Sequence, residues 1–281
     1  MKRVFFIFLL LISLTFGRDL ILVSIYPFYD VVKDIAGEGF RVESLVPPKA
    51  DYHTYELSPQ EVKKLNLAKV LFVSGAPLGE WEEKVQKMTK AKVFKLSEGI
   101  ELLSYGHEEL GKDPHFWVSP SRMIGVAKNV YVSLRKVYPQ RNFDKGYEET
   151  RKKLLKLHEE YEKTLSTCKV RRFGAVHSAF GYLAKDYGLE QVVIKEEHGH
   201  EHGDISPREL ARMVKEVKKG NIRVVLVPKG FSSKVARILR DEYGVEVYEI
   251  NIGIIPEFKG DNYYSVMKRN LMELRKALRC Q

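Results

Sequence analysis

The chain has 281 residues, of which 44% are hydrophobic, so it is long enough for two domains with separate cores. Its formal net charge is +10, with 47 lysines and arginines against 37 aspartates and glutamates. The basic runs at residues 152–156 and 215–219 have the pattern of solvated sides of amphipathic helices. Because the basic residues are dispersed, the composition argues against a nucleic-acid-binding surface.

The N-terminus predicts export. Lys2 and Arg3 precede an apolar run at residues 4–16, which is shorter than the roughly 20 residues that span a bilayer. Small residues, Thr15 and Gly17, stand where a signal peptidase would recognise them. We therefore expect residues 1–17 to be a cleaved signal peptide, with a membrane anchor as the alternative. No cysteine follows the run, so we expect a soluble periplasmic protein without a lipid anchor.

The first half alternates strand and helix patterns. A strand at residues 20–24 precedes a helix that stops at Gly37 and carries apolar residues at helical spacing: Phe28, Val31, Val32 and Ile35. A β-rich run follows at 41–46. After a polar loop, Ser58-Pro59-Gln60-Glu61 has the pattern of a capping box. The helix it starts leads to an apolar strand at 70–73.

The second half repeats this order. A strand at 172–176 precedes a helix that stops at Gly188 and has the same apolar spacing: Phe180, Leu183, Ala184 and Tyr187. A β-rich run at 191–194, a second capping pattern at Ser206-Pro207-Arg208-Glu209 and a strand at 224–227 complete the match. We therefore predict an α/β fold of two similar lobes with mainly parallel sheets.

One long helix is predicted between the lobes. Residues 142–167 place six apolar or aromatic side chains on one helical face: Phe143, Tyr147, Leu154, Leu157, Tyr161 and Leu165. The lobes would then be residues 18–141 and 168–281, with a ligand site in the cleft between them. A stiff helix resists bending, so we expect only a small tilt on metal binding. A last helix, carrying Met267 and Leu274, is predicted to be capped by Asp261.

The two cysteines, Cys168 and Cys280, are predicted to form a disulfide in an oxidising compartment. Neither has a neighbouring cysteine in a C-x-x-C pattern, which disfavours a cysteine metal site. Spacing alone does not show that the two are close in space.

Three of the eight histidines suggest a metal site. His177 follows the strand at 172–176, at the carboxyl end where α/β sheets bind ligands. His53 lies in the loop after 41–46, and His115 lies in a proline-bounded turn with aromatic residues. Each alone could be an ordinary half-buried residue, but three in such loops favour Zn²⁺, Cu²⁺ or Ni²⁺ over Mg²⁺ or Ca²⁺. We expect His158, among glutamates and lysines, to be solvated.

The chain resembles a family, the ZnuA-type periplasmic receptors of zinc and manganese ABC importers, over essentially its whole mature length. The motifs that carry the resemblance are His53-Thr54-Tyr55-Glu56, Gly75…Leu78-Gly79-Glu80-Trp81, Asp113-Pro114-His115-Phe116-Trp117, His177-Ser178-Ala179-Phe180-Gly181-Tyr182 and Tyr264…Met267…Asn270-Leu271. The resemblance implies that His53, His115 and His177 are imidazole ligands of a transported Zn²⁺. It also implies a monomeric receptor, not an enzyme, whose partners are an importer permease and its ATPase.

The chain departs from this family at the fourth ligand, which is commonly a carboxylate of the second lobe. Val227 and Asn251 stand at the two candidate positions. An asparagine oxygen is a weak ligand, so water or a mobile carboxylate could complete the site. Manganese and iron receptors rely on a carboxylate, so its absence favours zinc, with a manganese or iron receptor as the alternative.

A histidine-rich segment covers residues 196–204, with His198, His200 and His202 as auxiliary ligand candidates. Zinc receptors of the family often carry such a loop before the Asp-Pro-His motif, where this chain has only His107. We expect a weak scavenging site on this flexible segment, or a fourth imidazole for the main site. A plain polar surface loop is the alternative.

Two other classes of function could use similar residues. A zinc hydrolase also uses three histidines and an open position, but the chain has no His-Glu-x-x-His and no Gly-x-Ser-x-Gly motif. An adhesin or structural surface protein could share the same scaffold. Both are less favoured than a metal receptor.

Overall fold

The structure is a computed structural model, and it describes residues 17–104, 111–194, 207–230 and 233–281. The predicted signal peptide up to Phe16, His107 and the histidine-rich segment with His198, His200 and His202 lie outside these residues. In the described part of the chain, no helix combines the length and the apolar composition needed to cross a membrane.

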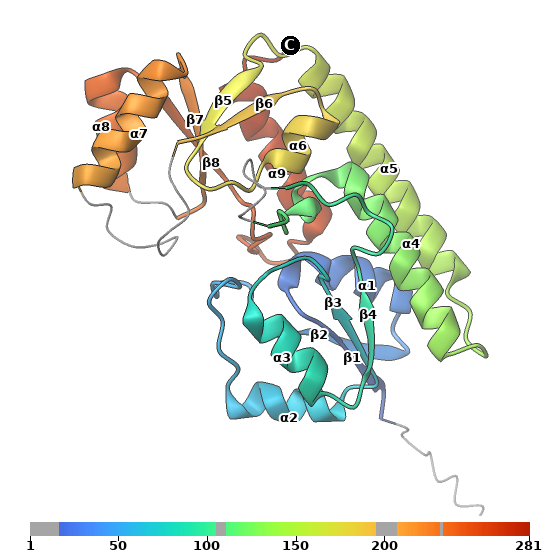
Figure 1. Cartoon of the computed structure of the whole chain (residues 1–281). Helices are drawn as coiled ribbons and strands as arrows, with labels where there is room; N and C mark the ends of the chain where they lie inside the picture. Colours follow the sequence, from blue (N-terminus) through green and yellow to red (C-terminus); the bar gives the residue numbers. More distant parts are fainter. Residues whose placement is uncertain (1–16, 105–110, 195–206, 231–232) are drawn as a thin grey trace, which may run out of the picture.

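Two parallel four-stranded sheets have the same strand order (Figure 1). The first, in the order β2-β1-β3-β4, is built from β1 (Asp19–Val23), β2 (Phe40–Ser44), β3 (Val70–Val73) and β4 (Lys92–Lys95). The second, in the order β6-β5-β7-β8, is built from β5 (Arg172–Ala175), β6 (Glu190–Val193), β7 (Val224–Pro228) and β8 (Glu246–Ile250). The shared order confirms the predicted α/β fold of two similar halves.

The sequence patterns did not predict two strands, β4 and β8, each of which lies at one edge of its sheet. Their side chains are mostly half-buried or exposed, so they lack the apolar runs of the central strands β1, β3 and β7. The sequence of a parallel strand buried on both faces is a continuous apolar run, whereas a partly exposed edge strand lacks that pattern.

Nine α-helices cover the described parts of the sheets and connect them: α1 (Tyr29–Ala36), α2 (Pro59–Leu67), α3 (Glu80–Met88), α4 (Pro120–Val137), α5 (Asp144–Ser166), α6 (Gly181–Asp186), α7 (Pro207–Lys219), α8 (Ser233–Tyr243) and α9 (Tyr263–Ala277). The predicted capping box of α2 is confirmed. The Ser58 hydroxyl accepts a hydrogen bond from the Glu61 N–H, and the Glu61 carboxylate accepts one from the Ser58 N–H. Ser206, the predicted cap of the helix that is α7, lies outside the described residues.

The predicted cap of α9 is wrong by one residue. Asn262, not Asp261, is the N-cap, and its side chain accepts a hydrogen bond from the Ser265 N–H at 3.0 Å. An N-cap side chain accepts the N–H of the second or third helical residue, and Asn262 accepts that of the third. The Asp261 carboxylate instead accepts hydrogen bonds from both Nη atoms of Arg269, at 2.9 and 2.6 Å.

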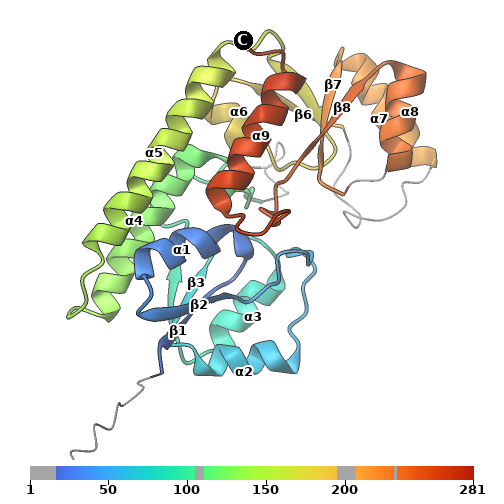
Figure 2. The ribbon, with the colours of Figure 1, turned by 180° about the vertical axis from the view of Figure 1, so that it is seen from behind.

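Helix α5 spans 23 residues and contacts elements of both halves. Figure 2 shows it running beside α4 and α9, with α1 near its first turns. Its buried face includes four of the residues predicted for it: Leu154, Leu157, Tyr161 and Leu165. The Tyr161 hydroxyl donates to the Met267 carbonyl at 2.7 Å, which joins α5 to α9. Helices of both halves thus pack against one common helix, α5.

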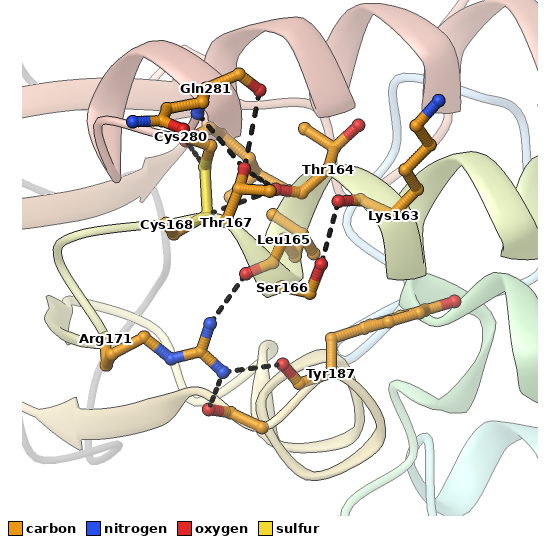
Figure 3. The surroundings of a disulfide bond; sticks show 12 residues. Lys163, Thr164, Leu165, Ser166, Thr167, Cys168, Arg171, Tyr187, Cys280 and Gln281 are labelled. Atoms are coloured by element: carbon orange, nitrogen blue, oxygen red, sulfur yellow. Dashed lines mark hydrogen bonds between the residues drawn. A yellow bond between two sulfur atoms is a disulfide. The ribbon is translucent and has the colours of Figure 1, made fainter.

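The predicted disulfide between Cys168 and Cys280 is confirmed (Figure 3). It ties the chain just after α5 to the chain just after α9. Thr167 adds to this join, because its hydroxyl accepts a hydrogen bond from the Gln281 N–H at 3.1 Å.

Reduction of this disulfide should destabilise the protein. The bond joins residues 112 positions apart, and closing a loop of this size is worth at most about 5 kcal/mol on the chain-entropy model. We expect the denaturant midpoint of the wild type to fall when a reductant is added. The double variant Cys168→Ser/Cys280→Ser should start from the lower midpoint and not respond to reductant. Equal midpoints for oxidised and reduced wild type would contradict the prediction.

A hydrogen bond links α1 of the first half to α9 of the second half. The Asp30 carboxylate on α1 accepts it from the N–H of Tyr263, the first residue of α9, at 2.8 Å. Burial raises the pKa of Asp30 from 3.8 to about 6, although this hydrogen bond opposes the shift. The folded protein therefore binds the Asp30 proton more tightly than the unfolded chain does. It follows that the free energy of unfolding decreases as the pH rises from about 4 to about 6.

The variant Asp30→Asn should lose this pH dependence, because its amide is neutral and can still accept from Tyr263. At pH 7 it should be more stable than the wild type, by at most about 3 kcal/mol, and near pH 4 the two should be similar. Denaturant titrations at both pH values test this, with the exposed Glu38→Gln as control. Parallel pH profiles for wild type and Asp30→Asn would refute the assignment.

Candidate metal centre

Three histidines from distant parts of the chain meet between the two sheets. His115 Nε2 lies 3.2 Å from His53 Nε2 and 3.0 Å from His177 Nε2. One ligand atom from each of the three lies within 4.8 Å of the other two. Among the described residues, this is the one group of three or more histidines, cysteines or acids placed to hold a metal ion.

His53 is held by the loop that follows β2 and by the loop before α3. Its backbone N–H donates to the Asp51 carboxylate at 2.8 Å. Trp81 Nε1 donates to the Tyr52 carbonyl at 2.7 Å. Gly79 lies against the His53 carbonyl so closely that a Cβ atom there would be 2.6 Å from that oxygen, and its φ of +153° also favours glycine.

His115 is fully buried and lies just before a 3₁₀ turn at Phe116–Val118. The Asp113 carboxylate accepts a hydrogen bond from the His115 N–H at 2.9 Å and lies 2.7 Å from Nδ1. A carboxylate can only accept, so this contact places the ring proton on Nδ1 and turns Nε2 towards the other histidines. Burial raises the pKa of Asp113 to about 7, although the hydrogen bond from the His115 N–H opposes that shift.

His177 follows β5, at the carboxyl end of the second sheet, as the sequence predicts. Its carbonyl accepts a hydrogen bond from the Ala179 N–H at 2.8 Å, within the turn that leads to α6. The candidate site therefore draws one histidine from the first half, one from the segment before α4 and one from the second half.

Trp117 packs beside the histidines and joins them to the second half. Its ring centroid lies 5.2 Å from that of His115 and 5.5 Å from that of Tyr52. Its Nε1 donates to the Ile252 carbonyl at 2.8 Å, and its own carbonyl accepts the Tyr263 hydroxyl at 2.8 Å. The sequence shows Trp117 as part of a motif but not these partners.

Asn251, a predicted auxiliary ligand, is engaged within its own loop. Its side-chain oxygen accepts the Ile255 N–H at 2.8 Å, and its side-chain nitrogen donates to the Ile255 carbonyl at 2.8 Å. Val227 lies buried in β7. His158 is half-buried rather than simply solvated, and its Nδ1 lies 3.0 Å from the Tyr187 hydroxyl.

A second polar cluster fixes the start of α4, and sequence patterns did not reveal it. The Asp186 carboxylate accepts hydrogen bonds from the Ser119 and Ser121 hydroxyls at 2.7 and 2.6 Å. Arg122 adds a bidentate contact to the same carboxylate at 2.6 to 3.1 Å. Burial works against ionisation, but these donors, Arg122 first, lower the pKa of Asp186. The segment that carries His115 is thereby fastened to α6.

Comparison with known proteins places these residues in a family. A family model described as ZnuA, the periplasmic component A of a zinc-uptake complex, matches residues 21–277. The zinc-binding protein AdcA of Streptococcus pyogenes serotype M3 is 32% identical, over 92% of this chain and 56% of AdcA. The chain thus spans just over half the length of that relative.

Two further proteins match most of their own length as well. The high-affinity zinc uptake system protein ZnuA of Bacillus subtilis is 29% identical, over 92% of this chain and 87% of its own. The crystal structure of the Zn(II)-bound ZnuA-like domain of Streptococcus pneumoniae AdcA superposes with a TM-score of 0.81 at 31% identity. It covers 93% of this chain and 99% of that domain.

Removing the Asp113 carboxylate should weaken metal binding without removing a ligand. Loss of such an outer partner typically lowers metal affinity 10- to 100-fold, because the histidine loses its fixed ring orientation. We expect Asp113→Ala to raise the Kd for Zn²⁺ by roughly that factor in a competition titration with a chelator. The matched control is Asp51→Ala, which alters a backbone contact of His53 but no ring nitrogen, and a smaller effect is expected. Unchanged affinity in Asp113→Ala would contradict this role.

Proposed function

The chain belongs to the ZnuA family of periplasmic zinc-uptake components, and on that premise we propose that it captures Zn²⁺ and delivers it to an importer. His53, His115 and His177 are the proposed ligands. Asn251 is left out of the proposed ligand set because both ends of its amide bond within its own loop.

The observation that carries the proposal is the spacing of the three imidazole nitrogens. Two ligands at 2.0–2.1 Å from a tetrahedral Zn²⁺ lie roughly 3.3 Å from each other. The two Nε2–Nε2 distances of 3.0 and 3.2 Å are close to that value. Two of the three nitrogen pairs thus already have the spacing that one ion requires, which lowers the cost of ordering them.

The donor set supports zinc over the alternatives. Within the described part of the chain, the cluster consists of three imidazoles without a carboxylate oxygen, whereas Mn²⁺ sites in proteins favour oxygen ligands. Water, or a histidine of the segment 196–204, would complete the coordination. A manganese or iron receptor of the same family remains the second candidate, and direct competition between the metals distinguishes the two.

The proposed receptor works outside the cytoplasm together with a membrane importer. We propose cleavage near Gly17, residence in the periplasm, and transfer of the ion to a permease driven by an ATPase. The proposed lobes are residues 18–141 and 168–281, joined by the helical segment 142–167. Because α5 contacts elements of both halves, we expect the lobes to tilt only slightly when zinc binds.

Calorimetry with Zn²⁺ tests the ligand assignment. We expect one tight site per chain in the wild type, and a loss of at least about 100-fold in affinity for His53→Ala, His115→Ala or His177→Ala. Each variant removes one of three direct bonds to the ion. His158→Ala is the matched control, since that residue bonds Tyr187 and should leave the affinity unchanged. If one of these three variants binds Zn²⁺ with wild-type affinity, the residue that it changes is not a ligand.

A further inference from the structure

A further buried acid, Glu82, lies in the first turn of α3, and the proposed function does not use it. The residue is 3% exposed. One carboxylate oxygen accepts the Ser74 N–H at 2.7 Å, and the other accepts the Gly75 N–H at 3.3 Å. These two N–H groups are the first after β3, at the carboxyl edge of the first sheet.

This edge is closely packed around Glu82. The Ser74 N–H also lies 3.2 Å from the hydroxyl of Ser24, the residue that follows β1. Gly75 has a φ of +74°, and a Cβ atom there would be 2.6 Å from the Lys95 Cβ atom. A buried carboxylate is costly unless it is hydrogen-bonded, so the contacts of Glu82 fix one arrangement of the turn after β3 and of α3.

The same turn of α3 holds His53. Trp81 directly precedes Glu82, and its indole N–H donates to the Tyr52 carbonyl at 2.7 Å. Gly79, the N-cap residue of α3, lies against the His53 carbonyl. A shift of α3 relative to β3 would therefore move these two contacts with the backbone at residues 52 and 53.

We propose that Glu82 is a positioning residue for metal binding, which acts by fixing the start of α3 and thereby the place of His53. The inference rests on the proposed function, in which His53 is a zinc ligand. Glu82 itself does not belong to the histidine cluster. Its contribution is to keep Trp81 and Gly79 where they hold the His53 backbone ready for the ion.

The test compares three variants of the mature protein for Zn²⁺ affinity and thermal stability. Glu82→Leu removes both acceptors and should raise the Kd for Zn²⁺ roughly 10-fold or more, by analogy with other outer partners of metal sites. Glu82→Gln keeps one acceptor oxygen, so it should restore part of the affinity. The matched control is Glu83→Gln, which changes the exposed neighbouring glutamate and should bind Zn²⁺ like the wild type.

A further variant, Gly79→Ala, tests the same path if Glu82→Leu does not fold. Its Cβ atom would press on the His53 carbonyl, so affinity should again fall. The visible spectrum of bound Co²⁺ should change in Glu82→Leu and Gly79→Ala, because the geometry around His53 changes. A merely structural role would lower the melting temperature but leave the Kd and this spectrum as in the wild type.

The outcomes separate the two proposals. A wild type that does not bind Zn²⁺ tightly would overturn the proposed function. A wild type that binds tightly, together with a folded Glu82→Leu that binds equally well, would overturn only the role of Glu82. If Glu82→Leu does not fold, wild-type affinity in both Glu82→Gln and Gly79→Ala would do the same.

Discussion

Three imidazole nitrogens must meet within the reach of one metal ion, although the chain brings them from distant segments. His53 follows β2, His115 precedes α4 and His177 follows β5, and their Nε2 atoms come within 3.0 to 3.2 Å of each other in two of the three pairs. A displacement of one half by an ångström would spoil this spacing. The relative placement of the two halves is therefore part of the site itself.

Several independent hydrogen bonds fix that placement, some with backbone groups and others between side chains. Tyr263 at the start of α9 donates its N–H to Asp30 and its hydroxyl to the Trp117 carbonyl. Trp117 in turn donates to the Ile252 carbonyl. Asp186 holds the beginning of α4 through two serines and Arg122. Buried hydrogen bonds of this kind are directional, so they specify position where apolar packing alone would allow sliding.

Two buried acids show how the ligands themselves are aimed. Asp113 contacts the His115 ring directly and sets which nitrogen faces the cluster. Glu82 accepts hydrogen bonds from two backbone N–H groups just after β3, next to the turn of α3 that contacts the backbone of residues 52 and 53. Burying a carboxylate costs free energy, and both acids have raised pKa values for that reason. Such a cost is tolerated where the carboxylate organises a precise local geometry.

The sequence by itself determined the alternation of strands and helices, the repeat of the two halves, the long helix 142–167 and the motifs with His53, His115 and His177, because period and capping patterns are local. It missed the edge strands β4 and β8, misplaced the cap of α9, and could not show which residues face one another. Only the tertiary structure brought the three histidines together, bonded Cys168 to Cys280 and directed Glu82 to the end of β3. These contacts join residues far apart in the chain, and no local spacing records them.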